Sequence, residues 1–316
     1  DVCSSDLMGA ACGNKFDVAE VIRLTARYGS LDTIEDDYGI NLMPLITFAI
    51  TTYENDPAVP FIPKGTKPEN YSDANVRLMT MIHKAIAVIS FKLEGQLVMR
   101  NPDFDMSHRL LLDKIDYEKG TIFIDGADYP LKDYYFPTID PKNPYALTPE
   151  EELVMNKLTS SFLNSAKLQD DVSFLFAKGS VYLVYNNNLM LHGCIPMKSE
   201  TEFKEFNHKG RMVKGKELLD ALEQTIRNVW VNRFNQTNND GDYFWYLWCG
   251  ACSPIFGKHR MATFERYLIE DKGPQSERLD LYYSLRNNVE VCERILAEFG
   301  LTNDKARIIN GHVPVK

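Results

Sequence analysis

The chain has 316 residues, of which 44% are hydrophobic, 11% aromatic and 25% charged, so it has an ordinary globular composition and ample length for a core. Its formal net charge is −9, from 44 acidic and 35 basic residues without a basic block, which disfavours nucleic-acid binding. No run of about 18 apolar residues occurs, so we expect no segment to span a membrane.

The first part of the chain is predicted to be mainly helical. Apolar residues at helical spacing predict three helices, over residues 8–27, 41–53 and 73–94. Ser72 is available to cap the third helix. Residues 31–37 are expected to form a short acidic connection, and four prolines predict an exposed loop over residues 56–71. His83 has no partner at i+4, so we expect it at a helix surface or interface.

The middle of the chain carries two strong local signals. Asp125 and Gly126 stand between two strand-like runs and predict a β-hairpin. Thr148 followed by Pro149 predicts the start of a helix that runs to about residue 166, because the threonine can cap it and the proline suits its first position. A further helix is expected over residues 170–178.

After residue 179 the pattern changes to strands separated by helices. Two strands are predicted, over residues 180–185 and 189–192, joined through three asparagines. Long helices are expected over residues 214–234 and 279–299, and a last strand over residues 306–310. These elements indicate an α+β fold in which a sheet-based core carries much helical material.

Two segments, residues 189–196 and 307–316, share one pattern. Each is an apolar strand-like run that stops at a histidine beside a glycine and is followed by a proline. Glycine permits a sharp turn and proline ends the strand pairing, so each segment delivers an imidazole to the rim of a sheet. His192 and His312 are therefore a candidate metal-binding pair. The alternative is that each histidine only satisfies a local turn.

The cysteines do not form a recognisable framework. Cys249 and Cys252 make a Cys-x-x-Cys sequence, but the aromatic segment before it does not resemble the strand of a redox motif. No second cysteine pair completes a zinc site. We expect free thiols, which indicates a reducing, cytoplasmic location.

Both ends of the chain look cut. Residues 1–7 show neither periodicity nor capping residues and resemble the translation of a sequencing-adapter end, so we expect a non-native leader there. The sequence stops inside a strand-like motif, and we expect an internal fragment of a longer protein. The predicted organisation is a mainly helical region at 8–179 and a later core at 180–316, with a helical excursion at about 199–305.

These residues resemble the class III fructose-1,6-bisphosphatases of bacteria, which belong to the calcineurin-like metallophosphatase superfamily. The segments that carry the resemblance are residues 8–14, 189–196, 245–258, 263–267, 295–301 and 308–316. The resemblance implies a partial metallophosphatase β-sandwich core, with its later strands only, and large mainly helical insertions.

The resemblance also implies a metal centre. In the superfamily, two divalent metals lie at strand ends, and the last two ligand motifs, a lone His and a Gly-His, match His192 and His312. The earlier motifs, Asp-x-His, Gly-Asp-x-x-Asp-Arg and Gly-Asn-His-Asp, are absent from this chain, so the catalytic His and Asp are expected upstream of it. The metal implied by the family is Mn²⁺.

Basic residues are needed to bind phosphate groups beside the metals. Lys258 and Arg260 lie on a glycine-containing loop and Arg266 follows in the next segment, so these three are the candidate substrate-binding residues. The alternative is that they are solvated charges. His108, His208 and His259 lack a neighbouring ligand at metal-binding spacing, and we assign them no role.

The function implied for the full-length protein is metal-dependent hydrolysis of fructose 1,6-bisphosphate to fructose 6-phosphate and phosphate, a gluconeogenic step. The implied partner is a small sugar phosphate, and homo-oligomerisation is left open. Two alternatives remain, a metallophosphatase that acts on another phosphoester and a helical oligomerisation or regulatory module without catalysis. The fragment itself is expected to be inactive.

Overall fold

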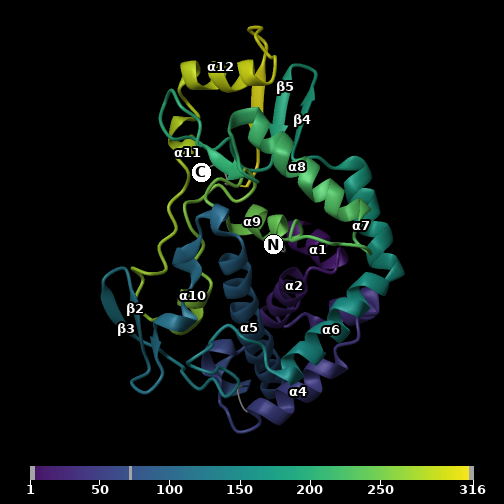
Figure 1. The fold of residues 1–316 in the computed structure, drawn as a ribbon, viewed down its shortest axis with the longest axis vertical. Helices are drawn as coiled ribbons and strands as arrows, with labels where there is room; N and C mark the ends of the chain where they lie inside the picture. Colours follow the sequence, from purple (N-terminus) through teal and green to yellow (C-terminus); the bar gives the residue numbers. More distant parts are fainter. Residues whose placement is uncertain (1–3, 71–72, 313–316) are drawn as a thin grey trace. The chain divides into compact units, whose positions relative to one another are not determined.

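The computed structural model describes residues 4–70 and 73–312, and its chain divides into two compact units (Figure 1). Unit 1 contains residues up to 102 together with 106–173 and 262–276. Unit 2 contains residues 103–105, 174–261 and those from 277 onward. The segment 262–276 therefore packs with the first part of the chain, although it follows most of unit 2 in the sequence.

Unit 1 is built around one long helix, α5 (Ala74–Arg100), whose residues are almost all buried between Ile82 and Val98. Two helices, α2 (Lys15–Arg27) and α4 (Met43–Tyr53), pack against α5. The other helices of this unit are α1 (Ser4–Ala11), α3 (Leu31–Tyr38), α6 (Pro149–Asn164) and α10 (Phe264–Leu268). Short 3₁₀ turns are Val59–Phe61, Pro68–Asn70, Ser107–Arg109 and Leu112–Lys114, and Pro102–Phe104 lies where the two units join along the chain.

A three-stranded antiparallel sheet belongs to unit 1, in the order β1 (Ile115–Asp116), β2 (Thr121–Ile124) and β3 (Ala127–Pro130). Its tight turn confirms the predicted hairpin, because Asp125 and Gly126 both have positive φ angles, 52° and 87°, as the favoured two-residue hairpin turn requires. Ile122 on β2 is fully buried and joins the core that surrounds α5 and α10.

Unit 2 contains a mixed three-stranded sheet in the order β4-β5-β8. β4 (Tyr182–Tyr185) pairs antiparallel with β5 (Asn188–Leu191), and β5 pairs parallel with β8 (Arg307–Asn310). The other elements are the hairpin β6 (Phe206–His208) and β7 (Arg211–Val213) and the helices α8 (Gly215–Val231), α9 (Asp242–Cys249), α11 (Tyr282–Leu285) and α12 (Val289–Glu298). Helix α7 (Ala166–Lys178) begins in unit 1 and ends in unit 2.

Several helix predictions were wrong in their boundaries. The single helix expected over residues 8–27 is interrupted between α1 and α2. Gly13 lies at the break and has a φ of 77°, which is incompatible with a right-handed helix. The segment expected to be an acidic connection is helix α3, which buries Leu31 and Ile34. The helix expected over residues 279–299 is interrupted, and Asn288 caps α12 by accepting hydrogen bonds from two backbone N–H groups.

The start of α5 and the position of His83 also differ from expectation. Asp73 caps α5, accepting from the backbone N–H of Asn75 at 2.8 Å, while Ser72 lies outside the described residues. His83 is 1% exposed, with Nδ1 2.6 Å from the carbonyl oxygen of Phe61 and Nε2 2.8 Å from the hydroxyl of Tyr267. Burial lowers the pKa of His83 to about 3, so it is a neutral core residue and not a surface one.

None of the helices in the described part of the chain combines the length and apolar composition that crossing a bilayer requires. The proposed non-native leader stays a prediction, and residues 1–3 of it lie outside the described residues.

Asp6, on α1, is a buried acidic residue without hydrogen bonds from the described residues. It is fully buried, and neither carboxylate oxygen has a hydrogen-bond partner in the described structure. Burial raises the pKa of Asp6 well above 3.8, and the nearby Glu20 raises it further, while Arg23 acts in the opposite direction. A buried carboxylate without hydrogen bonds costs free energy when it is ionised.

We predict that Asp6→Asn stabilises the protein at pH 7 by about 1–3 kcal/mol, since the variant removes the free-energy cost of protonating this carboxyl, or of burying it as an ion, without hydrogen bonds. The folded pKa lies above the unfolded value, so the folded state is favoured while Asp6 is protonated and this benefit is lost as pH rises above 3.8. The stabilisation should therefore be small near pH 4 and grow toward pH 7. Urea unfolding at both pH values measures it. The exposed Asp36→Asn is the control, and equal effects of the two substitutions would contradict the prediction.

Candidate metal centre

The parallel pairing of β5 with β8 brings His192 and His312 together. The register places Leu191 opposite Asn310, and the next residues continue the contact, since the N–H of Gly311 donates to the carbonyl oxygen of His192 at 3.1 Å. His192 Nε2 lies 3.0 Å from His312 Nδ1, and the ring centroids are 4.9 Å apart. The prediction that the two imidazoles meet at neighbouring strand ends is confirmed. Their role as metal ligands stays a prediction.

Gly193 is required where β5 ends, because the backbone there lies against a loop. The N–H of Cys194 donates to the carbonyl oxygen of Pro254 at 2.9 Å. A Cβ on Gly193 would lie 2.8 Å from the carbonyl oxygen of Ile255 and closer still to that of Pro254. The glycine therefore permits a close approach of two backbone segments, which fixes the direction of the chain directly after His192.

The second strand end turns differently from the expectation. The positive φ falls on His312, at 61°, and not on Gly311. A non-glycine residue in the left-handed region carries backbone strain of about 1–3 kcal/mol, which the surrounding structure must offset. Such strain is frequent at functional sites, and here it occurs at the residue whose ring contacts that of His192.

Both imidazoles are held in the neutral form. Partial burial lowers the pKa of His192 below 6.5. Partial burial also lowers the pKa of His312, and the neighbouring His192 and the positive charge of Lys258 lower it further, while a hydrogen bond to the Phe256 backbone acts in the opposite direction. A neutral imidazole has a free ring lone pair, which is the form that binds a metal. Both residues are exposed, so their rings are accessible to a ligand.

The nitrogen pair fits part of a metal centre. Two nitrogens bound at about 2.1 Å to one ion lie roughly 3.0–3.4 Å apart, and the observed separation falls at the short end of this range. Within residues 4–70 and 73–312, however, no group of three or more His, Cys, Asp or Glu side chains is arranged to hold a metal. The described part of the chain thus offers two nitrogen donors, and a complete centre needs further ligands.

Lys258 lies near this pair, since its charge lowers the pKa of His312. Its backbone forms an isolated bridge with Leu279, and its Nζ lies 2.8 Å from Oε2 of Glu277. The Glu277 side chain is only 6% exposed and that of Lys258 is 29% exposed. Lys258 is therefore held by a buried carboxylate, which differs from a freely solvated loop charge.

The positions of the other two predicted basic residues, Arg260 and Arg266, give no further support for substrate binding. Arg260 lies two residues further along the same loop and is partly buried, in unit 2. Arg266 is exposed on α10, in unit 1. The substrate-binding roles of both stay predictions. His259 is explained by the fold, because its Nδ1 accepts a hydrogen bond from the backbone N–H of Arg278 at 2.8 Å.

Asn310 and Tyr282 support the site, and the sequence analysis missed both. Asn310 Nδ2 donates to the carbonyl oxygen of Gly193 at 3.1 Å, and the Tyr282 hydroxyl donates to Asn310 Oδ1 at 3.2 Å. These bonds tie the two strand ends to each other and to α11. The available signal was a polar residue at the end of an apolar strand, directly before the Gly-His pair.

Cys194, Cys252 and Cys292 are free thiols, in agreement with the prediction. Helix α9 and not a strand precedes the Cys-x-x-Cys sequence. Burial raises the pKa of Cys252, which keeps it in the less reactive thiol form.

Comparison with known proteins identifies the family of the chain. A family profile described as Firmicute fructose-1,6-bisphosphatase matches residues 5–316, so the chain belongs to this family. The family resemblance noted from the sequence is thereby confirmed.

Individual relatives agree with this assignment. Proteins named fructose-1,6-bisphosphatase class 3 from Clostridium novyi, Clostridium tetani and Listeria innocua are 50%, 50% and 49% identical to this chain. Each alignment covers 98% of this chain but only 47–48% of the relative, so the chain spans about half the length of these proteins. No solved structure matches the chain.

We predict that Gly193→Ala destabilises the protein by about 1–3 kcal/mol, because a methyl group would press on two backbone carbonyls that have little room to move. The signals of the His192 ring should shift in NMR spectra, since the turn after β5 must open. Gly273→Ala is the control, as Gly273 is exposed and its nearest neighbour is a flexible aspartate side chain. An unchanged unfolding midpoint for Gly193→Ala would show that the close approach is not required.

Proposed function

We propose that this chain forms part of an enzyme that hydrolyses fructose 1,6-bisphosphate to fructose 6-phosphate and phosphate in gluconeogenesis. The observation that carries the proposal is the 3.0 Å contact between His192 and His312 at two neighbouring strand ends. In addition, the chain is 48% and 50% identical in sequence to two relatives that are named fructose-1,6-bisphosphatase class 3. We place the protein in the cytoplasm, in keeping with its free cysteines.

We propose that His192 and His312 are ligands of Mn²⁺ in a two-metal centre. Neutral imidazoles suit this ion together with carboxylates, which this proposal assigns to other parts of the enzyme. When bound, such ions neutralise phosphate oxygens and make a water molecule more acidic. In this proposal, the role of the chain is to hold two ring nitrogens at fixed positions. The β5–β8 pairing and the hydrogen bond from Asn310 to the Gly193 carbonyl oxygen fix these positions.

We propose that Lys258 binds a phosphate group of the substrate. Its charge acts on His312 and so lies close to the metal-binding pair. Its partial exposure leaves the ammonium accessible, and the ion pair with Glu277 restricts its position. A cation held in this way is suited to a phosphate that also contacts the metals.

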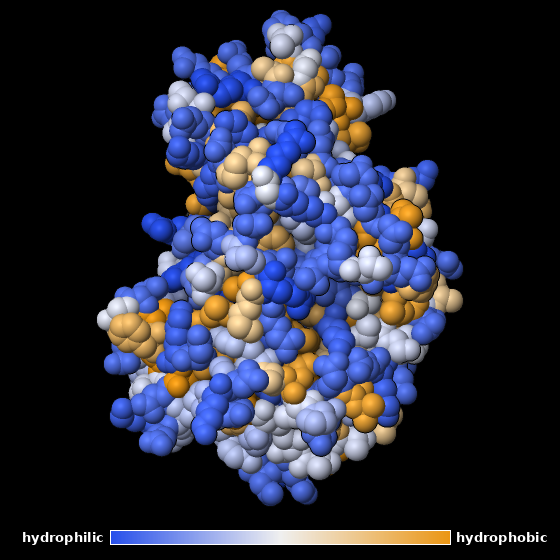
Figure 2. Space-filling model, viewed as in Figure 1, coloured by the Kyte–Doolittle hydropathy of each residue, from blue (hydrophilic) through white to orange (hydrophobic). Residues whose placement is uncertain are grey.

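We also propose that sheet β4-β5-β8 is the later part of a metallophosphatase β-sandwich. Leu183, Met190 and Ile309 form one row across its three strands, and Leu183 and Ile309 are 54% and 51% exposed. Figure 2 shows hydrophobic residues at the surface near β4. Among the described residues, β4 and β8 pair only with β5, so both outer edges are open. An open sheet with an uncovered apolar face suits a sandwich that lacks its second layer.

We predict that a chimaera restores activity. In it, residues 8–316 replace the matching region of the Clostridium novyi relative, and phosphate release from fructose 1,6-bisphosphate is measured with Mn²⁺. His192→Ala and His312→Ala should each lower kcat by at least about 100-fold, since removal of a ligand disrupts the metal centre. The chain alone should release no phosphate, because its described residues supply two ligands.

His259→Ala in the chimaera is the control, because His259 is bound to the Arg278 backbone and not to the candidate site. Full turnover in the His192→Ala and His312→Ala variants would contradict the metal assignment. Faster hydrolysis of a phosphoprotein or a dinucleotide than of the sugar bisphosphate would favour a different phosphoesterase. A folded chimaera that hydrolyses none of these substrates would support a non-catalytic module.

We predict that Lys258→Ala in the same chimaera raises KM by about tenfold, and that Lys258→Arg keeps KM near the parent value. Loss of the lysine also leaves Glu277 without this cation, which will lower stability. The double variant Lys258→Ala/Glu277→Gln removes that penalty and should still show the raised KM. Lys214→Ala, which breaks an exposed ion pair with Glu205, is the control. If KM in the double variant equals that of the parent chimaera, Lys258 does not bind the substrate and its role is structural.

A further inference from the structure

The chain segment 277–283 runs beside the loop that carries Lys258. Glu277 forms the ion pair with Lys258, whose backbone also makes an isolated bridge to this segment. The N–H of Asp280 donates to the carbonyl oxygen of Gly257, the residue before Lys258, at 2.9 Å. The position of the lysine backbone therefore depends on the position of this segment.

Asp280 connects this segment to other parts of unit 2 through its carboxylate, which is buried, with only 1% of the side chain exposed. Its Oδ1 accepts the N–H of Met197 at 3.1 Å and the N–H of Tyr282 at 2.9 Å. Its Oδ2 accepts from Lys204 Nζ at 2.7 Å. Two of the three donors are backbone N–H groups, so the carboxylate fixes the backbone of its neighbours and not only a side chain.

Both backbone donors lead to the pair of imidazoles. Met197 lies on the segment that continues from His192. The Tyr282 hydroxyl donates to Asn310 Oδ1 at 3.2 Å, and Asn310 ends the strand that leads to His312. One buried carboxylate thus links the loop of the candidate phosphate-binding lysine to both strand ends of the candidate metal centre.

We infer that Asp280 is a positioning residue, which sets the distance between Lys258 and the two imidazoles. The inference rests on the proposed function, in which one phosphate contacts the lysine and the metals together. A displacement of about 1 Å within such an arrangement can lower the rate about 100-fold.

The length of the Asp280 side chain matters more for this role than its charge. The N–H groups of Met197 and Tyr282 need an acceptor oxygen at a fixed place, which a neutral amide also supplies. The Lys204 side chain is 28% exposed, so its ammonium can turn toward water when the negative charge is removed.

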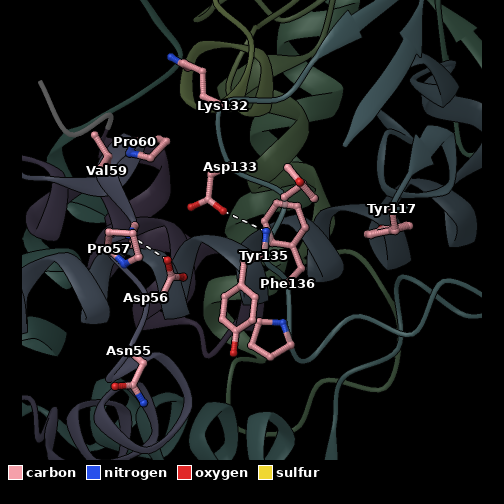
Figure 3. A pocket seen from close by; sticks show the side chains of 13 residues that line it. Asn55, Asp56, Pro57, Val59, Pro60, Tyr117, Lys132, Asp133, Tyr135 and Phe136 are labelled. Atoms are coloured by element: carbon pink, nitrogen blue, oxygen red, sulfur yellow. Dashed lines mark hydrogen bonds between the residues drawn. The ribbon is translucent and has the colours of Figure 1, made fainter. Parts of the chain in front are cut away.

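A second buried carboxylate, that of Asp133, has similar bonds and provides a matched control. Its Oδ2 accepts from the buried Lys84 Nζ at 2.7 Å, and its Oδ1 accepts the N–H of Tyr135 at 3.0 Å. Figure 3 shows Asp133 and Tyr135 at the wall of a cavity of about 790 Å³. Asp133 belongs to unit 1, whereas Lys258 and both imidazoles belong to unit 2.

Two substitutions in the chimaera separate side-chain length from charge. Asp280→Glu keeps the charge and adds one methylene, and it should raise KM for fructose 1,6-bisphosphate at least about fivefold. Asp280→Asn keeps the length and an acceptor oxygen, so KM should stay within about twofold of the parent value. Asp133→Glu should lower the unfolding temperature and leave KM unchanged.

An unchanged KM in folded Asp280→Glu, or an equal rise of KM in Asp280→Glu and Asp280→Asn, would overturn the inference. If circular dichroism shows that Asp280→Glu is unfolded, Asp280→Ala makes the same test, because it removes both acceptor oxygens without adding atoms to the core.

A double-mutant cycle tests whether Asp280 acts through Lys258. In the Lys258→Ala chimaera, Asp280→Glu should change KM by less than about twofold, because the cation whose position it sets is already absent. A general structural disturbance would instead raise KM by the same factor with and without the lysine. That additive result would contradict the positioning role.

A measurement without turnover separates this inference from the proposed function. In the full chain, acetic anhydride should acetylate Lys258 at least about twofold faster in Asp280→Glu than in the parent, since the displaced segment loosens the Glu277–Lys258 pair. Mass spectrometry measures the rate, with Lys214 in its exposed ion pair as the internal reference. An inactive parent chimaera would contradict the proposed function alone, whereas an unchanged acetylation rate of Lys258 would overturn the inference.

Discussion

The candidate site depends on one interaction, the parallel pairing of β5 with β8. These strands are more than a hundred residues apart in the sequence, and their register sets Leu191 opposite Asn310. A parallel pair needs a long crossover connection, and here α8, α9, α11 and α12 lie within it. A shift of one residue in this register would move His312 away from His192, so the contact between the two imidazoles is a direct consequence of backbone hydrogen bonding.

The sequence could predict the strands and histidines of this site because their signals are local. A run of apolar residues, a His beside a Gly and a following Pro are all readable within eight residues. The helix boundaries were harder, since they depend on tertiary packing. Residues 31–38 look acidic and unstructured, yet the burial of Leu31 and Ile34 makes them a helix. Gly13 breaks a segment whose composition is helical throughout, because its φ of 77° lies in the left-handed region, and the Leu163 side chain packs where a Cβ would lie.

What the sequence could not show is which partner a polar side chain finds. His83 was expected at a helix surface or interface, but its partner Tyr267, which lies 184 positions away on α10, could not be named from the sequence. Lys258 was predicted on a loop as a substrate-binding residue, and its carboxylate partner Glu277 comes from a segment that returns beside the loop. Asn310 was overlooked because its bond to the carbonyl oxygen of Gly193 exists only after β5 and β8 have paired.

The electrostatics of the site follow from these partners. An unpaired lysine beside two imidazoles would lower their pKa and favour the neutral, metal-binding form, but it would also repel the metal cations. Glu277 is buried and bonded to Lys258, so it compensates part of this charge while the lysine stays partly exposed. Burial is the main cause of the lowered pKa of His312, and the charges of His192 and Lys258 lower it further. In the proposed enzyme, this pairing would leave Lys258 able to contact an anionic substrate and would limit its repulsion of bound metal ions.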